Sequence, residues 1–290
     1  MVSTASRVAV AKTYKIYIDG KFPRTESGRY FTLEDRDGNV IANVSRGSRK
    51  DFRNAVVAAR SAFGKWSAAS AYLRGQILYR IAEMLEGRRE QFIAELVTQG
   101  VSKRRAAAEV DACTDRIVYY AGWADKYQQI FSAVNPVSSS HFNFSVLEPT
   151  GVVAIIAPDD TGLLGLVSNV MPAIVGGNAC VVLASESLPL SAVSFAEVLH
   201  ASDVPPGVVN ILTGYRGELT TQFASHMDVN AIVYTDADTE VGKSIQVEAA
   251  QNIKRVIARP GVKWEADTAQ SPYLIQDTQE TKTTWHPIGS

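Results

Sequence analysis

The sequence has few of the side chains that enzymes use as nucleophiles or metal ligands. Its 290 residues include two cysteines and four histidines. Cys113 and Cys180 form no CxxC pair, and no two histidines have HxH or HxxxH spacing, so the pattern excludes a disulfide framework and argues against any metal site. Neither cysteine has the basic neighbour or helix N-terminus that favours a thiolate, and we expect both to be buried in the core.

Net charge and long apolar runs are also lacking. The 29 basic and 30 acidic residues leave a formal net charge of −1, which excludes the basic excess of a nucleic-acid or anionic-membrane binder. No apolar run reaches the ~18 residues of a membrane span, and the opening MVSTASRVAVAK lacks the apolar core of a signal peptide. With 46% apolar residues the composition is typical of a soluble globular protein. We expect a cytoplasmic location, with no nucleic acid or membrane as a partner.

The N-terminal part, residues 1–140, is predicted to contain short strands followed by helices. Residues 14–44 have the pattern of strands around turns. Apolar residues at helical spacing predict three helices, over 51–66, 71–100 and 103–131. Ser48 or Asp51 is the expected cap of the first helix. We interpret the basic run 103–105 as the solvated face of the third.

Residues 141–258 have a different pattern, in which short β-branched runs alternate with helical stretches. The runs are GVVAIIAP, ACVVLAS, VVNILTG and AIVYTD. Continuous apolar strands alternating with helices predict βαβ units and a parallel sheet covered on both faces. We therefore predict an α/β fold with a Rossmann-like doubly wound sheet, although no GxGxxG motif is present. Residues 259–290 are predicted to be a polar connector, with terminal strands in YLIQD and ETKTTWHPI.

Several ordered segments give the chain a resemblance to the aldehyde dehydrogenase superfamily. They are YIDGKF, YYAGWADK, EPTGVVAIIAP, PAIVGGNACVV, SESLPLSA, VPPGVVNILTG and TEVGKSI. The resemblance implies that the catalytic domain, which bears the nucleophilic cysteine, is missing between the strand at 253–261 and the terminal strand. In this respect the chain is most similar to the cysteine-less second domain of the family-16 aldehyde dehydrogenases.

The same resemblance implies that the family's oxyanion site has been lost. Pro158-Asp159-Asp160 stands where family members have proline-tryptophan-asparagine. The asparagine amide donates to the developing oxyanion, whereas an ionised Asp160 can only accept and would repel it, so no catalytic residue is assigned. Leu183 stands at the place of the lysine that holds the adenosine ribose.

The resemblance also implies a degraded site for the dinucleotide. Glu186 and Gly217 match family contacts, but Ala237-Asp238, after Asp236, replaces the Gly-Ser that meets the pyrophosphate. Asp238 suits a helix cap. A carboxylate ~4 Å from a phosphate charge nevertheless costs ~4 kcal/mol at an effective dielectric of ~20, against ~0.3–1 kcal/mol from the helix dipole. We therefore expect no cofactor, or NAD held weakly by Pro158, Asp159, Glu186, Gly217 and Asp238.

Three functions remain open from the sequence. The first is a non-catalytic subunit that assembles with itself or with a full-length aldehyde dehydrogenase. The resemblance implies that strands 141–149 and ETKTTWHPI carry this assembly by pairing across subunits. The second is an NAD(P)-dependent oxidoreductase that acts on aldehydes only in complex with a partner, and the third is a nucleotide-binding regulatory module.

Overall fold

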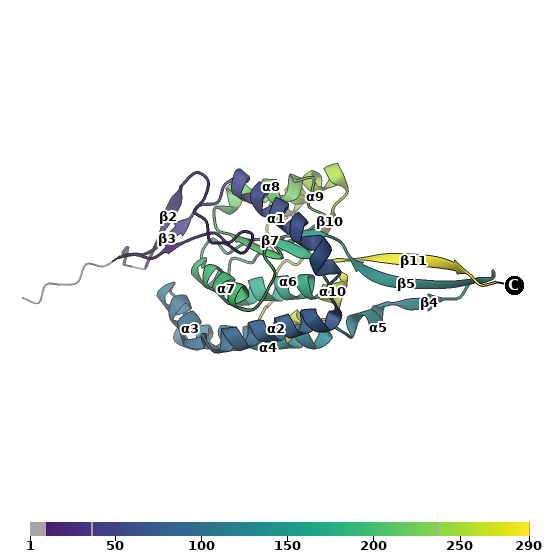
Figure 1. The fold of residues 1–290 in the computed structure, drawn as a ribbon. Coiled ribbons are helices and arrows are strands. Elements are labelled where there is room, and N and C mark those ends of the chain that lie inside the picture. The colour runs from purple at the N-terminus through teal and green to yellow at the C-terminus, as the bar shows by residue number, and fades with distance from the viewer. Residues whose placement is uncertain (1–9, 36, 236, 290) are drawn as a thin grey trace, which may run out of the picture.

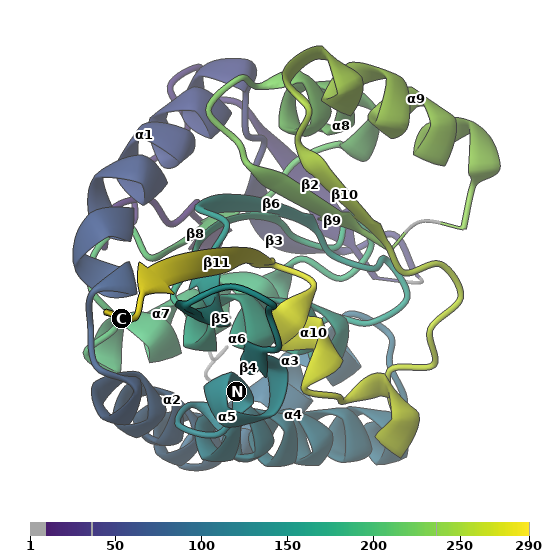
Figure 2. The same ribbon diagram turned by 90° about the vertical axis from the view of Figure 1, so that its right-hand side faces the viewer.

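A five-stranded parallel sheet runs through the centre of the computed structural model, which describes residues 10–35, 37–235 and 237–289 (Figure 2). Its strand order is β10-β9-β6-β7-β8. The strands are β6 (Val152–Ile156), β7 (Ala179–Leu183), β8 (Val209–Leu212), β9 (Ala231–Tyr234) and β10 (Arg255–Ala258). The chain adds β7 and β8 on one side of β6 and then crosses to add β9 and β10 on the other. The predicted Rossmann-like doubly wound sheet is confirmed.

Helices cover both faces of this sheet (Figure 1). They are α1 (Arg49–Ser67), α2 (Ala71–Glu86), α3 (Arg89–Thr98), α4 (Lys103–Trp123), α5 (Tyr127–Phe131), α6 (Leu164–Val175), α7 (Leu190–Ala201), α8 (Arg216–Ser225), α9 (Thr239–Ala249) and α10 (Tyr273–Gln276). Because successive strand residues point to opposite faces, alternate side chains of each strand pack on α1, α8 and α9 or on α6 and α7. Within the described residues no helix is both long and apolar enough to cross a membrane.

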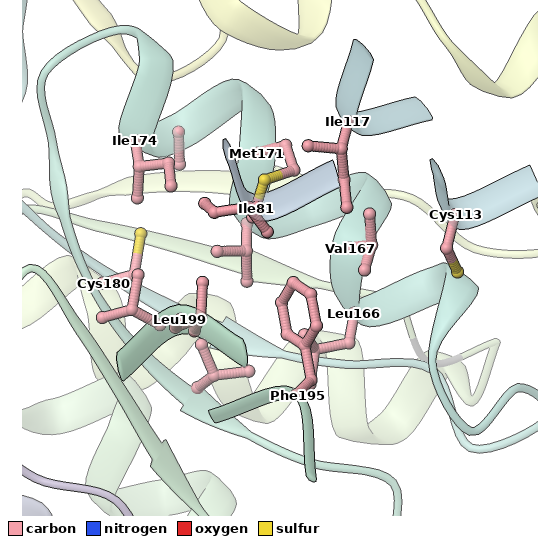
Figure 3. Packing of buried hydrophobic residues seen from close by; sticks show 14 of the residues in the cluster. Ile81, Cys113, Ile117, Leu166, Val167, Met171, Ile174, Cys180, Phe195 and Leu199 are labelled. Atoms are coloured by element: carbon pink, nitrogen blue, oxygen red, sulfur yellow. The ribbon is translucent and has the colours of Figure 1, made fainter. Parts of the chain in front are cut away.

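The core on the α6 face also includes the N-terminal helices. Side chains from α2, α4, α6, α7 and β7 meet there, among them Ile81, Ile117, Met171, Cys180 and Phe195 (Figure 3). The apolar stripe of each N-terminal helix is thereby buried against the sheet domain. The division of the chain at residues 140 and 258 stays a prediction.

The predicted helix starts are confirmed, but two predicted helices are each divided in two. Ser48 caps α1 in a capping box with Asp51. The stretch 71–100 ends its first helix at Gly87, and the chain restarts as α3. The stretch 103–131 is interrupted at residues 124–126, where the Ala124 N–H donates to the Ala121 carbonyl three residues back instead of continuing the α-helical ladder.

Two smaller sheets flank the central one. At the N-terminal side β1 (Thr13–Tyr14), β2 (Tyr30–Glu34) and β3 (Val40–Ser45) form a sheet in the order β1-β3-β2. On the other side β4 (Ala133–Asn135), β5 (His141–Pro149) and β11 (Gln279–Pro287) form a sheet that projects away from the body, and we call these three strands the arm (Figure 1).

The arm corrects two expectations about the C-terminal residues. β11 pairs antiparallel with β5 of the same chain over nine residue pairs, from Gln279 opposite Pro149 to Pro287 opposite His141. The expectation that this pairing is made across subunits is therefore wrong for β11 and β5, because the terminal strand satisfies one of its edges within the chain. The YLIQD stretch is also not a strand, since Tyr273–Gln276 form α10 and bury Ile275.

The connector between β10 and β11 has a polar composition, but part of it is buried in the apolar core. Trp264 is 2% exposed and joins the core on the α6 face. The buried Arg116 of α4 donates to the carbonyls of Trp264 and Ala269 at 3.1 and 3.0 Å, and Arg259 donates to Asp277 Oδ2 at 2.8 Å. These contacts hold the connector against α4 and α6.

Candidate functional site

The predicted site residues lie at the carboxyl edge of the central sheet, where β6 and β9 diverge. In doubly wound folds this reversal of strand order opens a crevice for ligands. A cavity of about 340 Å³ lies there. Its lining comes from the loops after β6, β8, β9 and β10 and consists of Pro158, Asp159, Asp160, Arg216, Thr235, Ala237, Gly261, Val262 and Trp264.

Asp159 is fully engaged by the turn that follows β7. Its Oδ1 accepts from the N–H groups of Glu186 and Ser187 at 2.7 and 3.0 Å and from Ser185 Oγ at 2.9 Å, while Oδ2 accepts from Ser187 Oγ. Burial alone would raise the pKa of this carboxyl. The hydrogen bonds from Ser187 and the charge of Arg216 outweigh burial and lower the pKa. Asp159 is therefore an ionised group that positions residues 185–187.

Glu186 and Arg216 bind each other at the start of α8. The Arg216 N–H donates to Glu186 Oε2 at 2.7 Å. The Arg216 guanidinium donates to the carbonyl of Ala157 and lies 3.7 Å from Asp159 Oδ1. Glu186 thus caps α8, whose N-cap residue Tyr215 makes no side-chain cap. Gly217, the next residue of α8, is exposed and does not line the cavity.

Asp160 is exposed and is held through its backbone. The Arg105 guanidinium donates to the Asp160 carbonyl at 3.0 Å and lies 3.7 Å from Glu265. The basic run 103–105 is therefore not only a solvated face, because Arg105 joins α4 to this loop and to the connector. The Asp160 side chain offers this loop a carboxylate and no amide donor, and its assignment to the oxyanion position stays a prediction.

Glu109 of α4 forms hydrogen bonds with the end of the same loop. Its Oε1 accepts from the N–H groups of Leu163 and Leu164 at 2.8 and 3.1 Å, at the start of α6. Leu163 is the N-cap residue of α6 and makes no side-chain cap of its own, so α4 supplies the missing acceptor. Burial raises the pKa of Glu109 despite these two donors.

The remaining predicted residues do not converge on the cavity. Leu183 is 0% exposed and packs in the core on the α1 face, so it contacts no crevice. Asp238 caps α9 as predicted, with Oδ1 accepting from the Glu240 N–H at 2.8 Å. Ala237 lines the cavity, and Asp236 lies outside the described residues.

Both thiols are inaccessible. Cys113 and Cys180 are each 0% exposed, and burial raises the pKa of both. Among the described residues no group of three or more histidine, cysteine, aspartate or glutamate side chains could hold a metal ion. Among the described residues that line the cavity there are two carboxylates and one guanidinium, and no thiol.

Three contributors to the site had no signal in the sequence. Arg216, Arg105 and Trp264 reach the loop at 157–160 from positions 55 to more than 100 residues away. Arg216 could have been suspected only from its place directly before Gly217. The other two are ordinary residues of a helix and a connector until the fold brings them together.

Comparison with known proteins gives one consistent group of relatives. The model of the aldehyde dehydrogenase family matches residues 23–266. The cytosolic aldehyde dehydrogenase 1 of Elephantulus edwardii is 35% identical over 257 residues, which is 86% of this chain and 50% of the relative. The omega-crystallin of Enteroctopus dofleini is 34% identical over 253 residues, which is 84% of this chain and 50% of the relative.

The solved structures give the same result. The aldehyde dehydrogenase of Bacillus cereus, in its NAD+ complex, superposes with a TM-score of 0.81 at 29% identity. The match covers 87% of this chain and 51% of that one. The chain thus spans about half the length of the relatives it matches.

Proposed function

This chain belongs to the aldehyde dehydrogenase family, and we propose that it is a non-catalytic member that acts by assembling with other subunits. The observation that carries the proposal is that neither Cys113 nor Cys180 reaches solvent. Oxidation of an aldehyde in this family needs an activated thiolate, and burial stabilises the protonated thiol instead. Any nucleophile would have to come from outside the described residues.

The carboxyl-edge cavity does not fit a dinucleotide. The Glu186 carboxylate already binds the start of α8, and the Arg216 side chain lies across the end of β6. Asp159 and Asp160 add negative charge to the cavity, and Asp238 adds a carboxylate at the start of α9, where the sequence predicts the pyrophosphate. A volume of about 340 Å³ is also at the lower end of small-ligand pockets, which span roughly 300–1,000 Å³. We therefore assign no NAD-dependent step to this chain.

The arm supports a role in assembly. Val134, Phe142 and Phe144 lie on one face of its sheet, and Val134 and Phe142 are 67% and 45% exposed. The two phenylalanine rings lie beside each other in a tilted arrangement with centroids 5.4 Å apart. A projecting sheet with exposed aromatic side chains is typical of a surface that another subunit covers. The partner is a second copy of this chain or a full-length family member.

A second candidate, a regulatory module, is favoured by one observation. A cavity lies at the switch point, although several of the residues expected to contact a nucleotide are replaced. Its mixed charge would suit a small zwitterion better than a nucleotide. For both candidates the proposed location is the cytoplasm.

The assembly proposal is tested by light scattering and an aldehyde assay on the purified chain. We expect an oligomer at micromolar concentration, or a mixed complex after addition of a full-length aldehyde dehydrogenase, and no NADH production from aliphatic or aromatic aldehydes. A monomer under both conditions contradicts assembly. Turnover above ~1 s⁻¹ by the chain alone contradicts the non-catalytic assignment.

A further inference from the structure

A second cavity, of about 530 Å³, lies between the first turns of α1 and the C-terminal end of α8. It shares no lining residue with the cavity at the carboxyl edge. Arg49, Lys50 and Arg53 contribute three cationic groups to its lining, and no carboxylate does. Phe52 and Met227 contribute the apolar part.

The three cations are poorly compensated by the rest of the chain. Lys50 lies 2.6 Å from Glu26, but among the described residues neither Arg49 nor Arg53 forms an ion pair. All three lie within the first five residues of α1, where the helix dipole favours negative charge. Ser48 and Asp51 supply the acceptors that cap this helix start, and the three cations, which are donors only, can play no part in capping. Three cations at a helix N-terminus lower the stability of the helix, and residues that lower stability in this way are typical of a functional site.

His226 adds a neutral hydrogen-bond donor to the same cavity. Its ring packs edge-on against Phe52 with centroids 5.5 Å apart, and its Nδ1 accepts from the Asp228 N–H at 3.2 Å. The proton of the neutral ring is thereby assigned to Nε2. Burial and the charges of Lys254, Arg49 and Arg53 lower the pKa of His226, while Asp228 acts in the opposite direction.

We propose that this cavity binds a small organic phosphate, with Arg49, Arg53 and His226 holding the phosphate and Met227 contacting the organic part. Two guanidinium groups recognise phosphate oxygens through paired hydrogen bonds, which a single ammonium group does not provide. The exposed Met227 is a flexible, polarisable contact for a planar or apolar group. The volume lies in the range of small-molecule pockets. This inference does not depend on the proposed role in assembly.

The test is calorimetry of the full chain with ATP as the probe and inorganic pyrophosphate as the comparison. We expect saturable binding of ATP, weaker binding of pyrophosphate, and a loss of affinity with added salt. Arg49→Gln with Arg53→Gln should weaken ATP binding at least tenfold. Arg104→Gln, which removes an exposed arginine of α4, and Arg216→Gln, which changes the other cavity, should leave it unaltered.

A second readout is the titration of the His226 ring by NMR. A bound phosphate stabilises the imidazolium, so ATP should raise the His226 pKa in the native chain and not in the double variant. If the double variant does not fold, Arg53→Gln alone replaces it, with unfolding in urea as the check. The proposal is overturned if 1 mM ATP does not bind, if Arg216→Gln abolishes binding, or if only phosphatidylserine vesicles bind at these arginines.

Discussion

The backbone N–H of Arg216 donates to Glu186 Oε2 across 2.7 Å, joining the loop after β7 to the first residue of α8. The sequence predicts Glu186 as a contact of the dinucleotide, yet here its carboxylate caps a helix. The charge of the guanidinium on the same arginine is met by Asp159. Two carboxylates at the carboxyl edge therefore stabilise this chain's own loops and are not available to a ligand without a cost in stability.

Removing the Glu186 charge should lower stability. Glu186→Gln weakens the hydrogen bond that the helix N-terminus donates to a charged acceptor, and we expect a loss of about 1–2 kcal/mol in the free energy of unfolding. Urea denaturation measures it. The control is Glu83→Gln, an exposed carboxylate of α2, which should change stability by less than about 0.5 kcal/mol. Equal effects of the two substitutions would contradict a capping role.

Glu109 should make stability fall as pH rises. Because burial raises its pKa in the folded chain above the ordinary 4.5, the folded state binds this proton more tightly than the unfolded state. Its contribution is thus largest below pH 4.5 and is lost as pH rises through the folded pKa. Glu109→Gln removes this dependence, so the stability of the native chain minus that of the variant should decrease between pH 4.5 and 7.

Asp159→Asn provides the opposite case for the same measurement. The pKa of Asp159 is lowered, so its contribution is complete above its ordinary value of 3.8 and is lost only as pH falls below it. Between pH 4.5 and 7 the stability difference for Asp159→Asn should therefore stay constant. A decrease like that of Glu109→Gln would show that global charge, and not these two environments, sets the pH dependence.

NAD should bind with a dissociation constant above ~1 mM, equivalent to less than ~4 kcal/mol. Asp238→Ser should tighten binding severalfold, since serine also caps helices and α9 stays intact while the negative charge is removed. Glu248→Gln, near the other end of α9, removes an equal charge and serves as the control in calorimetry. No gain for Asp238→Ser would mean that this helix start is not the place of the pyrophosphate.

Leu183→Lys, which would restore the family's residue type, is not a useful companion to that substitution. The Leu183 side chain is 0% exposed among apolar neighbours, so a lysine ammonium there would have to be desolvated or displace the strand. We expect Leu183→Lys to unfold the chain at a lower urea concentration without improving NAD binding. The assignment of Leu183 to the family's lysine position stays a prediction, and the sequence could not show which way this side chain faces.

The elements that the sequence predicted well are those with local signals. Ser48 and Asp51 form a capping box from residues three apart, and the buried strands are continuous apolar runs. Burial of the two cysteines likewise followed from their apolar surroundings.

The features that the sequence did not predict depend on distant contacts. The Arg216 guanidinium meets a carbonyl 59 residues away, and Trp264 is buried in the core on the α6 face, where Arg116 of α4 binds the carbonyls of the connector. The α10 stretch has the β-branched and aromatic composition of a strand, but it follows Pro272 and buries Ile275 against α6. Propensity could not anticipate that packing.

The arm should control assembly through its aromatic face. Because β11 already pairs with β5 inside the chain, Phe142→Ser leaves nine backbone pairs in place and removes mainly apolar contact with a partner. We expect the dissociation constant of the oligomer to rise at least tenfold, about 1.4 kcal/mol, with little change in thermal stability. Tyr72→Ser, which removes an exposed aromatic side chain of α2, is the control and should leave the constant unchanged. Deleting residues 279–290 should act more severely, since it exposes the β5 edge and turns the oligomer into monomer or aggregate. If sedimentation finds the same oligomer for the native chain and Phe142→Ser, this face of the arm does not carry the assembly.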